Sequence, residues 1–122
     1  MIFGIGSDII EIERVGKSIL KEEFKQKLYS EREIAYCEAN RKAESYAARF
    51  AGKEAFFKAL GTGWRDGLIL TEVEILNDEL GKPYIELSGK TKEIVEAKGV
   101  KHIHISLSHS KENAIAYVVL EK

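Results

Sequence analysis

The side chains best suited to chemistry lie in the segment RFAGKEAFFKALGTG, residues 49–63. Glu54 and Lys58 are four residues apart there, so in a helix both project from one face. One interpretation is a solvent-exposed ion pair, which contributes little to stability. The surrounding side chains are apolar, however, and charges beside apolar groups need partners. The second interpretation is therefore a carboxylate that binds a metal ion beside an ammonium that binds a phosphate.

A second carboxylate, Asp8, follows the apolar N-terminal segment. An aspartate at this place suits the N-cap of a helix that begins directly after it. It also suits a metal ligand at the end of a strand, because two carboxylates with phosphate oxygens and water complete the usual Mg²⁺ shell. Spacing alone does not establish that Asp8 and Glu54 meet.

Three histidines, His102, His104 and His109, lie near the C-terminus. A zinc site is not expected, because no cysteine pair accompanies them. His102 and His104 alternate with apolar residues, as on the surface of a sheet. His109 lies in SLSHS, residues 106–110, where neighbouring hydroxyls make contact with a phosphate plausible. The chain has no Gly-x-Ser-x-Gly elbow, Walker loop or dinucleotide fingerprint, so the serines are not assigned as nucleophiles.

The elements that position these groups follow from hydrophobic periodicity. In the first half we expect a strand at 2–10, a helix at 12–20 that continues to 28 after a break, a helix that begins at 31, and a long helix at 43–60. Ser30 and Glu33 form a capping box for the third of these segments. Gly61 is a natural left-handed helix cap, and Gly63 allows a sharp turn.

The second half has the two-residue period of strands. We expect strands at 70–75 and 84–87 around a turn at 77–83, a helix at 90–98, and strands at 102–110 and 114–121. Glycines at 4 and 6 predict a kink or a close backbone approach, and Gly52 predicts close packing on the long helix. The order predicts an α+β fold with a largely antiparallel sheet packed against a long helix and shorter helices.

Composition limits the function further. A length of 122 residues predicts one domain, residues 1–122, and 44% hydrophobic with 32% charged residues is typical of a soluble globular protein. The net charge of −1 argues against a nucleic-acid partner, and the apolar stretches are too short to span a membrane. The first ten residues, MIFGIGSDII, lack a basic region followed by a long apolar run, so we do not expect them to be a signal peptide. Its single cysteine, Cys37, fits a reducing cytoplasm and is expected to be a half-buried helix residue.

Taken together, three stretches resemble the holo-[acyl-carrier-protein] synthases, the small class of 4′-phosphopantetheinyl transferases. They are GIGSDIIEIER at 4–14, RFAGKEAFFKALGTG at 49–63 and SLSHS at 106–110. The resemblance extends over nearly the whole chain. It implies transfer of 4′-phosphopantetheine from coenzyme A to a serine of apo acyl carrier protein, with release of adenosine 3′,5′-bisphosphate. It also implies a place in fatty acid biosynthesis, in the cytoplasm.

The resemblance assigns roles to individual residues. Asp8 and Glu54 would bind Mg²⁺, Lys58 would contact the diphosphate of coenzyme A, and His109 would help to hold its nucleotide part. Glu54 and Lys58 would be the catalytic pair, with either Glu54 or a metal-held water as the base. The glycines that follow the long helix, at 61 and 63, would let the next loop approach coenzyme A.

The resemblance also implies partners. Arg14, with Lys17 and Lys21 by position, would meet the acidic helix of the carrier protein, since residues 14–27 carry a local excess of basic side chains. The family is typically a homotrimer with its sites between subunits. Residues 64–66 depart from the more apolar start that the family pattern has for this loop. A non-catalytic module that binds coenzyme A or another nucleotide is the alternative function, and it would have no use for paired carboxylates.

Overall fold

The computed structural model describes residues 1–63 and 67–122; the departure from the family pattern at residues 64–66 lies outside the described residues. The first half of the chain forms β1 (Ile2–Glu11), α1 (Ile12–Ser18), α2 (Glu22–Leu28), α3 (Glu31–Ala39) and α4 (Lys42–Leu60). The second half forms the 3₁₀ turn η1 (Leu70–Glu72), β2 (Val73–Asn77), β3 (Pro83–Leu87), α5 (Gly89–Ala97), β4 (His102–His109) and β5 (Asn113–Glu121).

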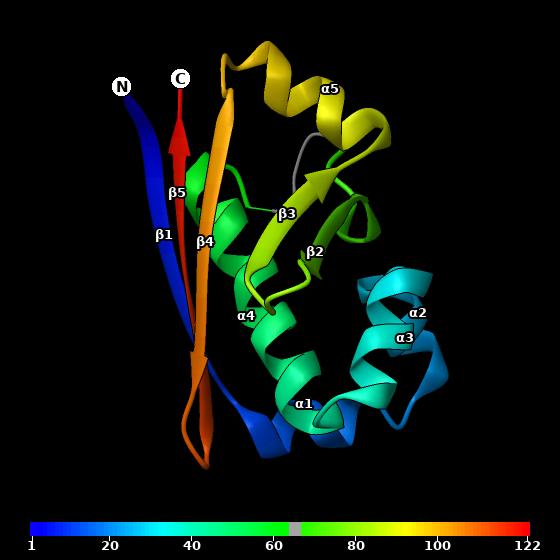
Figure 1. Cartoon of the computed structure of the whole chain (residues 1–122). Coiled ribbons are helices and arrows are strands. Elements are labelled where there is room, and N and C mark those ends of the chain that lie inside the picture. The colour runs from blue at the N-terminus through cyan, green and yellow to red at the C-terminus, as the bar shows by residue number, and fades with distance from the viewer. Residues whose placement is uncertain (64–66) are drawn as a thin grey trace.

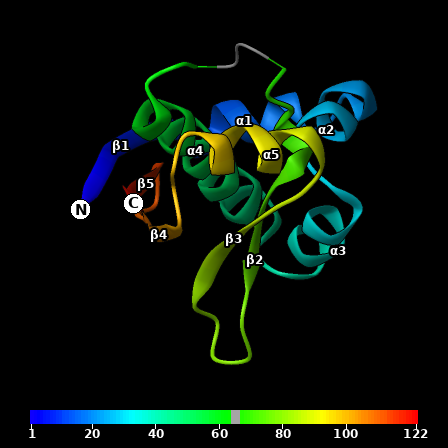
Figure 2. The same cartoon turned by 90° about the horizontal axis from the view of Figure 1, so that it is seen from above.

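The strands form two separate antiparallel sheets. One has the order β1-β5-β4, and the other is the hairpin β2-β3. Helix α4 lies between them: it packs along one face of the larger sheet, and the hairpin lies on its other side (Figure 1). Viewed from above, the tip of the hairpin projects away from the helices (Figure 2). The α+β class and the long helix against an antiparallel sheet are thus confirmed.

Helix α4 approaches β1 closely because both elements present small residues at their contact. A Cβ atom at Gly4 would fall on the carbonyl oxygen of Ala59, and one at Gly6 would fall on that of Ala55. Only glycine therefore fits these two strand positions, as the sequence predicted. On another face of α4, a Cβ at Gly52 would lie 2.5 Å from Ile75 Cδ1, which confirms the close packing expected there.

The helix boundaries follow local chemistry. Ser30 and Glu33 form the reciprocal capping box, and α3 begins at Glu31. Gly61 ends α4 in the left-handed conformation with φ 82°, where glycine has no Cβ penalty. The predicted break after the first helix separates α1 from α2.

Three local expectations differ from the structure. The strand containing Asp8 continues to Glu11, so Asp8 lies inside it, and the N-cap position of α1 belongs to Glu11. Leu70 lies in η1 and not in a strand, which begins only at Val73. Cys37 is fully buried rather than half-buried. In the part of the chain that the structure describes, none of the helices combines the length and the apolar character needed to cross a membrane.

Candidate active site

Asp8 is held on β1, an edge strand of the larger sheet. It pairs with Ala116 of β5, and its side chain alternates toward the face that α4 covers, where it is 16% exposed. The N-cap interpretation of Asp8 is therefore wrong. An aspartate fixed by a paired strand presents its carboxylate to the neighbouring helix with little freedom of the backbone.

Glu54 and Lys58 come from α4, and Lys58 pairs with Asp8 instead of forming the simple helical ion pair. The Lys58 ammonium lies 3.1 Å from Asp8 Oδ1 and donates a 3.0 Å hydrogen bond to the carbonyl oxygen of Ser7. Glu54 is half-buried, and burial raises the pKa of its carboxyl group. The nearby carboxylate of Asp8 raises that pKa further, while the Lys58 ammonium opposes the shift. Strand and helix thus bring two carboxylates and one ammonium together.

A hollow of about 430 Å³ opens beside the two carboxylates. Asp8, Glu54 and Arg14 give it a charged part, and Phe24 and Phe50 give it an apolar part. Within residues 1–63 and 67–122, no group of three histidine, cysteine, aspartate or glutamate side chains could hold a metal ion. Two carboxylates fit Mg²⁺ when phosphate oxygens and water complete its shell, because this ion keeps several non-protein ligands. The residues present therefore suit Mg²⁺ bound together with a phosphate.

His109 lies in a different hollow, of about 580 Å³. Arg41, Arg49, Tyr36 and Pro83 also line this second hollow. Asp8 and Glu54 do not; they line only the hollow of about 430 Å³ described above. One chain by itself does not gather His109 with the two carboxylates. Arg49 is buried there and donates to the carbonyl oxygen of Ile75 and to the side chain of Asn77, so Arg41 and His109 are the groups in this hollow best suited to a phosphate.

The other two histidines lie on the outward face of the sheet. His102 and His104 are both exposed, and His104 Nε2 lies 2.5 Å from Glu121 Oε1. This position matches the sheet-surface interpretation of these residues.

The basic residues expected to meet a carrier protein lie on α1 and at the start of α2. Arg14 and Lys17 are on α1, where Lys17 pairs with Glu13 at 3.3 Å on the surface, and Lys21 occupies the N-cap position of α2. Lys25 differs from the expectation of a basic face over residues 14–27. Its side chain is only 16% exposed and is engaged by Glu22 and Glu38.

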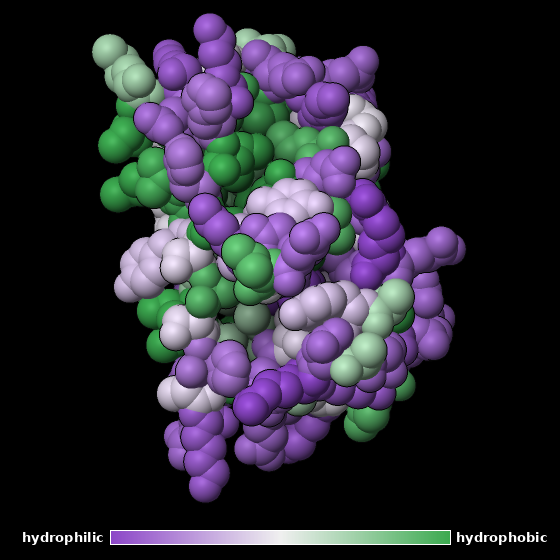
Figure 3. Space-filling model, in the orientation of Figure 1, coloured by the Kyte–Doolittle hydropathy of each residue, from purple (hydrophilic) through white to green (hydrophobic). Residues whose placement is uncertain are grey.

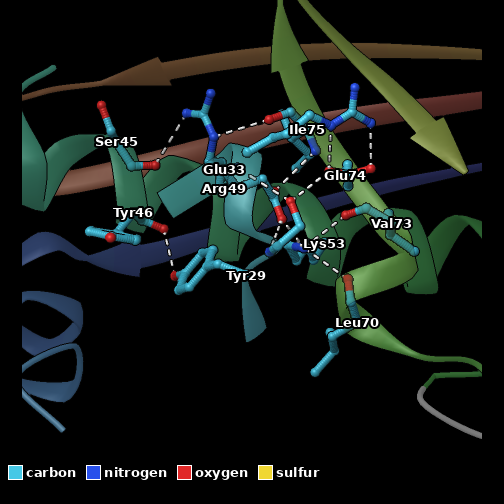
Figure 4. Close-up of polar contacts among 12 residues, drawn as sticks. Tyr29, Glu33, Ser45, Tyr46, Arg49, Lys53, Leu70, Val73, Glu74 and Ile75 are labelled. Atoms are coloured by element: carbon cyan, nitrogen blue, oxygen red, sulfur yellow. Dashed lines mark hydrogen bonds and ion pairs between the residues drawn. The ribbon is translucent and has the colours of Figure 1, made fainter. Parts of the chain in front are cut away.

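Sequence reasoning missed a buried ion pair on the far side of α4, between Glu33 and Lys53 (Figure 4). The Lys53 ammonium donates to Glu33 Oε1 and to the carbonyl oxygens of Leu70 and Val73, each at 2.8 Å. Glu33 Oε2 accepts from the amide of Ile75. Burial lowers the pKa of Lys53, and the Glu33 carboxylate opposes that shift.

A signal for this pair was present in the sequence, because Lys53 stands among apolar residues of a helix. Its partner was hidden by the role of Glu33 in the capping box. The pair fastens the chain that returns from α4 to β2.

Residues 4–118 match the 4′-phosphopantetheinyl transferase superfamily, so the chain belongs to it. A holo-[acyl-carrier-protein] synthase of Clostridium acetobutylicum is 50% identical over 123 residues, which cover 99% of this chain and 98% of that protein. The family suggested by the sequence motifs, and with it an enzyme of the transferase class, is confirmed.

Solved structures agree with this assignment. The crystal structure of holo-[acyl-carrier-protein] synthase from Neisseria meningitidis superimposes with a TM-score of 0.88 at 32% identity and covers all of both chains. That of the Helicobacter pylori enzyme, in complex with coenzyme A, has a TM-score of 0.85 at 34% identity and covers 96% of this chain and 99% of that one.

Proposed function

We propose that this protein transfers the 4′-phosphopantetheine group of coenzyme A to a serine of apo acyl carrier protein. The observation that carries the proposal is the meeting of Asp8, Glu54 and Lys58 beside an open hollow. A serine oxygen of the carrier attacks the β-phosphorus of coenzyme A. The bond from that phosphorus to the bridging oxygen breaks, and adenosine 3′,5′-bisphosphate leaves. The nucleophile belongs to the partner, so this chain needs none of its own.

In this proposal Asp8 and Glu54 hold Mg²⁺, which when bound neutralises charge on the diphosphate. Lys58 adds a second positive charge at the phosphates, and phosphoryl transfer depends mainly on such electrostatic stabilisation. Glu54, or a water held next to it, takes the proton of the serine.

The carrier protein docks on α1, with Arg14, Lys17 and Lys21 facing its acidic helix. The apolar part of the first hollow, formed by Phe24 and Phe50, suits apolar groups of a docked partner. The product is the holo carrier protein used in fatty acid biosynthesis, a step that we place in the cytoplasm. The buried free thiol of Cys37 agrees with a reducing compartment.

We further propose a homotrimer with its sites between subunits. The outward face of the larger sheet exposes Ile5 at 68%, Ile9 at 62% and Tyr117 at 55%, an apolar surface of a kind that partners commonly cover. Hydrophobic residues gather on the side of the molecule where β1 and β5 lie (Figure 3). In this proposal the His109 hollow of one chain lies beside Asp8 and Glu54 of its neighbour, as a site between subunits requires. A single ligand could then contact both hollows, which one chain keeps apart.

One incubation tests the reaction. Apo acyl carrier protein is mixed with coenzyme A and the enzyme, with and without a chelator, and its mass is measured. Transfer adds about 340 Da to the carrier, because the product is covalent, and the chelator abolishes the addition. A module that only binds coenzyme A leaves the carrier mass unchanged, and that result would reject the proposal.

Variants separate the proposed roles. Glu54→Gln should abolish the metal-dependent transfer with the fold intact. Arg14→Glu should raise the KM for the carrier much more than the KM for coenzyme A. Lys101→Glu, the same charge reversal at an exposed site at the opposite end of the molecule, is the matched control and should change neither. For the trimer, Tyr117→Glu places a charge on the proposed interface and should lower the molar mass of the assembly measured by light scattering. If the variant remains trimeric, this face is not the interface.

A further inference from the structure

The Lys58 side chain contacts the carboxylate of Asp8. Its ammonium lies 3.1 Å from Asp8 Oδ1 and 3.0 Å from the carbonyl oxygen of Ser7 that it contacts. The Asp8 side chain is 16% exposed, whereas that of Lys58 is 56% exposed. The carboxylate is thus fixed and largely enclosed, and the cation reaches it from solvent on a long, flexible stem.

This arrangement conflicts with a divalent cation on the same carboxylate. A metal ion held by Asp8 and Glu54 would stand close to the ammonium, and like charges at such distances repel. The Lys58 ammonium is the exposed partner in both of its hydrogen bonds, so water can replace its acceptors. The ammonium is therefore the group that can leave, because it loses little when solvent takes over its hydrogen bonds.

We propose that Lys58 is an internal competitor of the metal ion for Asp8, and that the diphosphate of coenzyme A relieves the competition by drawing the ammonium away. This inference rests on the proposed function, since it takes Asp8 and Glu54 as the metal ligands. It makes metal ion and coenzyme A bind cooperatively. By linkage, coenzyme A tightens metal binding by the same factor by which the metal ion tightens coenzyme A binding.

The size of the effect follows from the exposure of the pair. A partly exposed ion pair is weak, so removing Lys58 should tighten metal binding in the absence of coenzyme A by roughly two- to fivefold. The same removal should reduce the factor by which coenzyme A tightens metal binding, because no ammonium is then left for the diphosphate to draw away from Asp8.

Mn²⁺ alone is the probe, with free Mn²⁺ measured by electron paramagnetic resonance at low ionic strength. Wild type is compared with Lys58→Met and with Arg14→Met. Arg14 lines the same hollow, so its replacement removes one positive charge there without removing the hydrogen bond to Asp8. The expected result is a two- to fivefold tighter dissociation constant for Lys58→Met and a smaller change for Arg14→Met. The titrations are repeated with coenzyme A and no carrier protein, and the gain from coenzyme A should be smaller in Lys58→Met.

Equal effects of the two substitutions would overturn the inference, since general charge and not competition would then explain them. The variant Asp8→Asn distinguishes this failure from failure of the proposed function. If Asp8→Asn abolishes Mn²⁺ binding while Lys58→Met leaves it unchanged, the metal site stands and the competition does not. If Asp8→Asn binds Mn²⁺ as wild type does, the proposed metal ligands are wrong and the inference falls with them. Circular dichroism of each variant establishes that it is folded.

Discussion

Replacing Gly6 by alanine should damage both the fold and the site, because β1 lies against the backbone of α4 at this position. The added Cβ would overlap the carbonyl oxygen of Ala55 and lie 2.7 Å from the amide nitrogen of Ala59. Both atoms belong to a helix backbone and cannot swing aside as a side chain can. The strand must move by more than 0.7 Å: that is the difference between 2.7 Å and the 3.4 Å at which ordinary contacts begin, and the overlap with the Ala55 carbonyl oxygen is closer still.

The magnitude has two parts. Inserting a methyl group into a tightly packed contact costs about 3 kcal/mol at the upper end of the usual range, which lowers Tm by roughly 10 °C in a domain of this size. The displacement also carries Asp8, two residues further along the strand, away from Glu54. Misplacing a reacting or metal-holding group by about 1 Å costs about 100-fold in rate. Gly6→Ala should therefore transfer about 100-fold more slowly even where it is folded.

The assay combines thermal unfolding with the rate of mass gain of the carrier protein, at a temperature where every variant is folded. Gly16→Ala is the matched control: its Cβ would meet only Ala43 Cβ, at an ordinary 3.7 Å. It lies in a helix, where alanine is more favourable than glycine by up to about 1 kcal/mol, so Tm should rise or stay constant. Wild-type Tm and rate in Gly6→Ala would refute the close contact. A lowered Tm with a wild-type rate would show that the strand position does not control the site.

Three further outcomes follow. Lys53→Met leaves Glu33 as an unpaired buried charge, so the free energy of unfolding in urea should fall by about 3–5 kcal/mol, and an unchanged value would contradict the buried pair. Because the pKa of Glu54 is raised above its ordinary 4.5, the folded protein binds that proton more tightly than the unfolded chain does, and the ionised group destabilises the fold at higher pH. Without metal, Glu54→Gln should therefore have a higher Tm than wild type at about pH 7, and this difference should disappear at about pH 4. A Tm difference between variant and wild type that is the same at both pH values would contradict the raised pKa of Glu54. Raising NaCl from about 0.05 to 0.5 M should raise the KM for the carrier severalfold with kcat nearly constant, and less so in Arg14→Glu; a salt-independent KM would exclude charge steering.

The features predicted correctly from sequence are those set by local chemistry. The capping box of Ser30 and Glu33 and the left-handed cap at Gly61 depend on residues within one helical turn, so the chain carries the whole signal locally. The close approach at Gly4 and Gly6 was also predictable, since two glycines in an apolar strand indicate that another element packs closely there. The sequence does not indicate which element that is. The neighbour is the alanine side of α4.

The errors come from tertiary pairing. Asp8 has the local signature of a helix cap, but the strand continues past it. Strand β5 keeps pairing with β1 from Asp8, opposite Ala116, as far as Glu11, opposite Asn113. Glu33 was visible as a capping residue, whereas its contact with Lys53 joins residues from separate helices that only the packed fold brings together. The separation of His109 from the two carboxylates is likewise a property of the sheet order, since β5 lies between β1 and β4.

The two lysines of α4 illustrate why burial, and not residue type, decides what a cation does. Lys53 and Lys58 are five residues apart, which places them about 140° apart around the helix axis. Lys53 faces η1 and β2, where three protein acceptors at 2.8 Å surround it, and no solvent is available to replace them. It is therefore a fixed structural cation. Lys58 faces β1 at the surface, where both its acceptors can exchange with water or phosphate. A group that must pass from a carboxylate to an incoming diphosphate needs replaceable partners, and on this helix Lys58 has them and Lys53 does not.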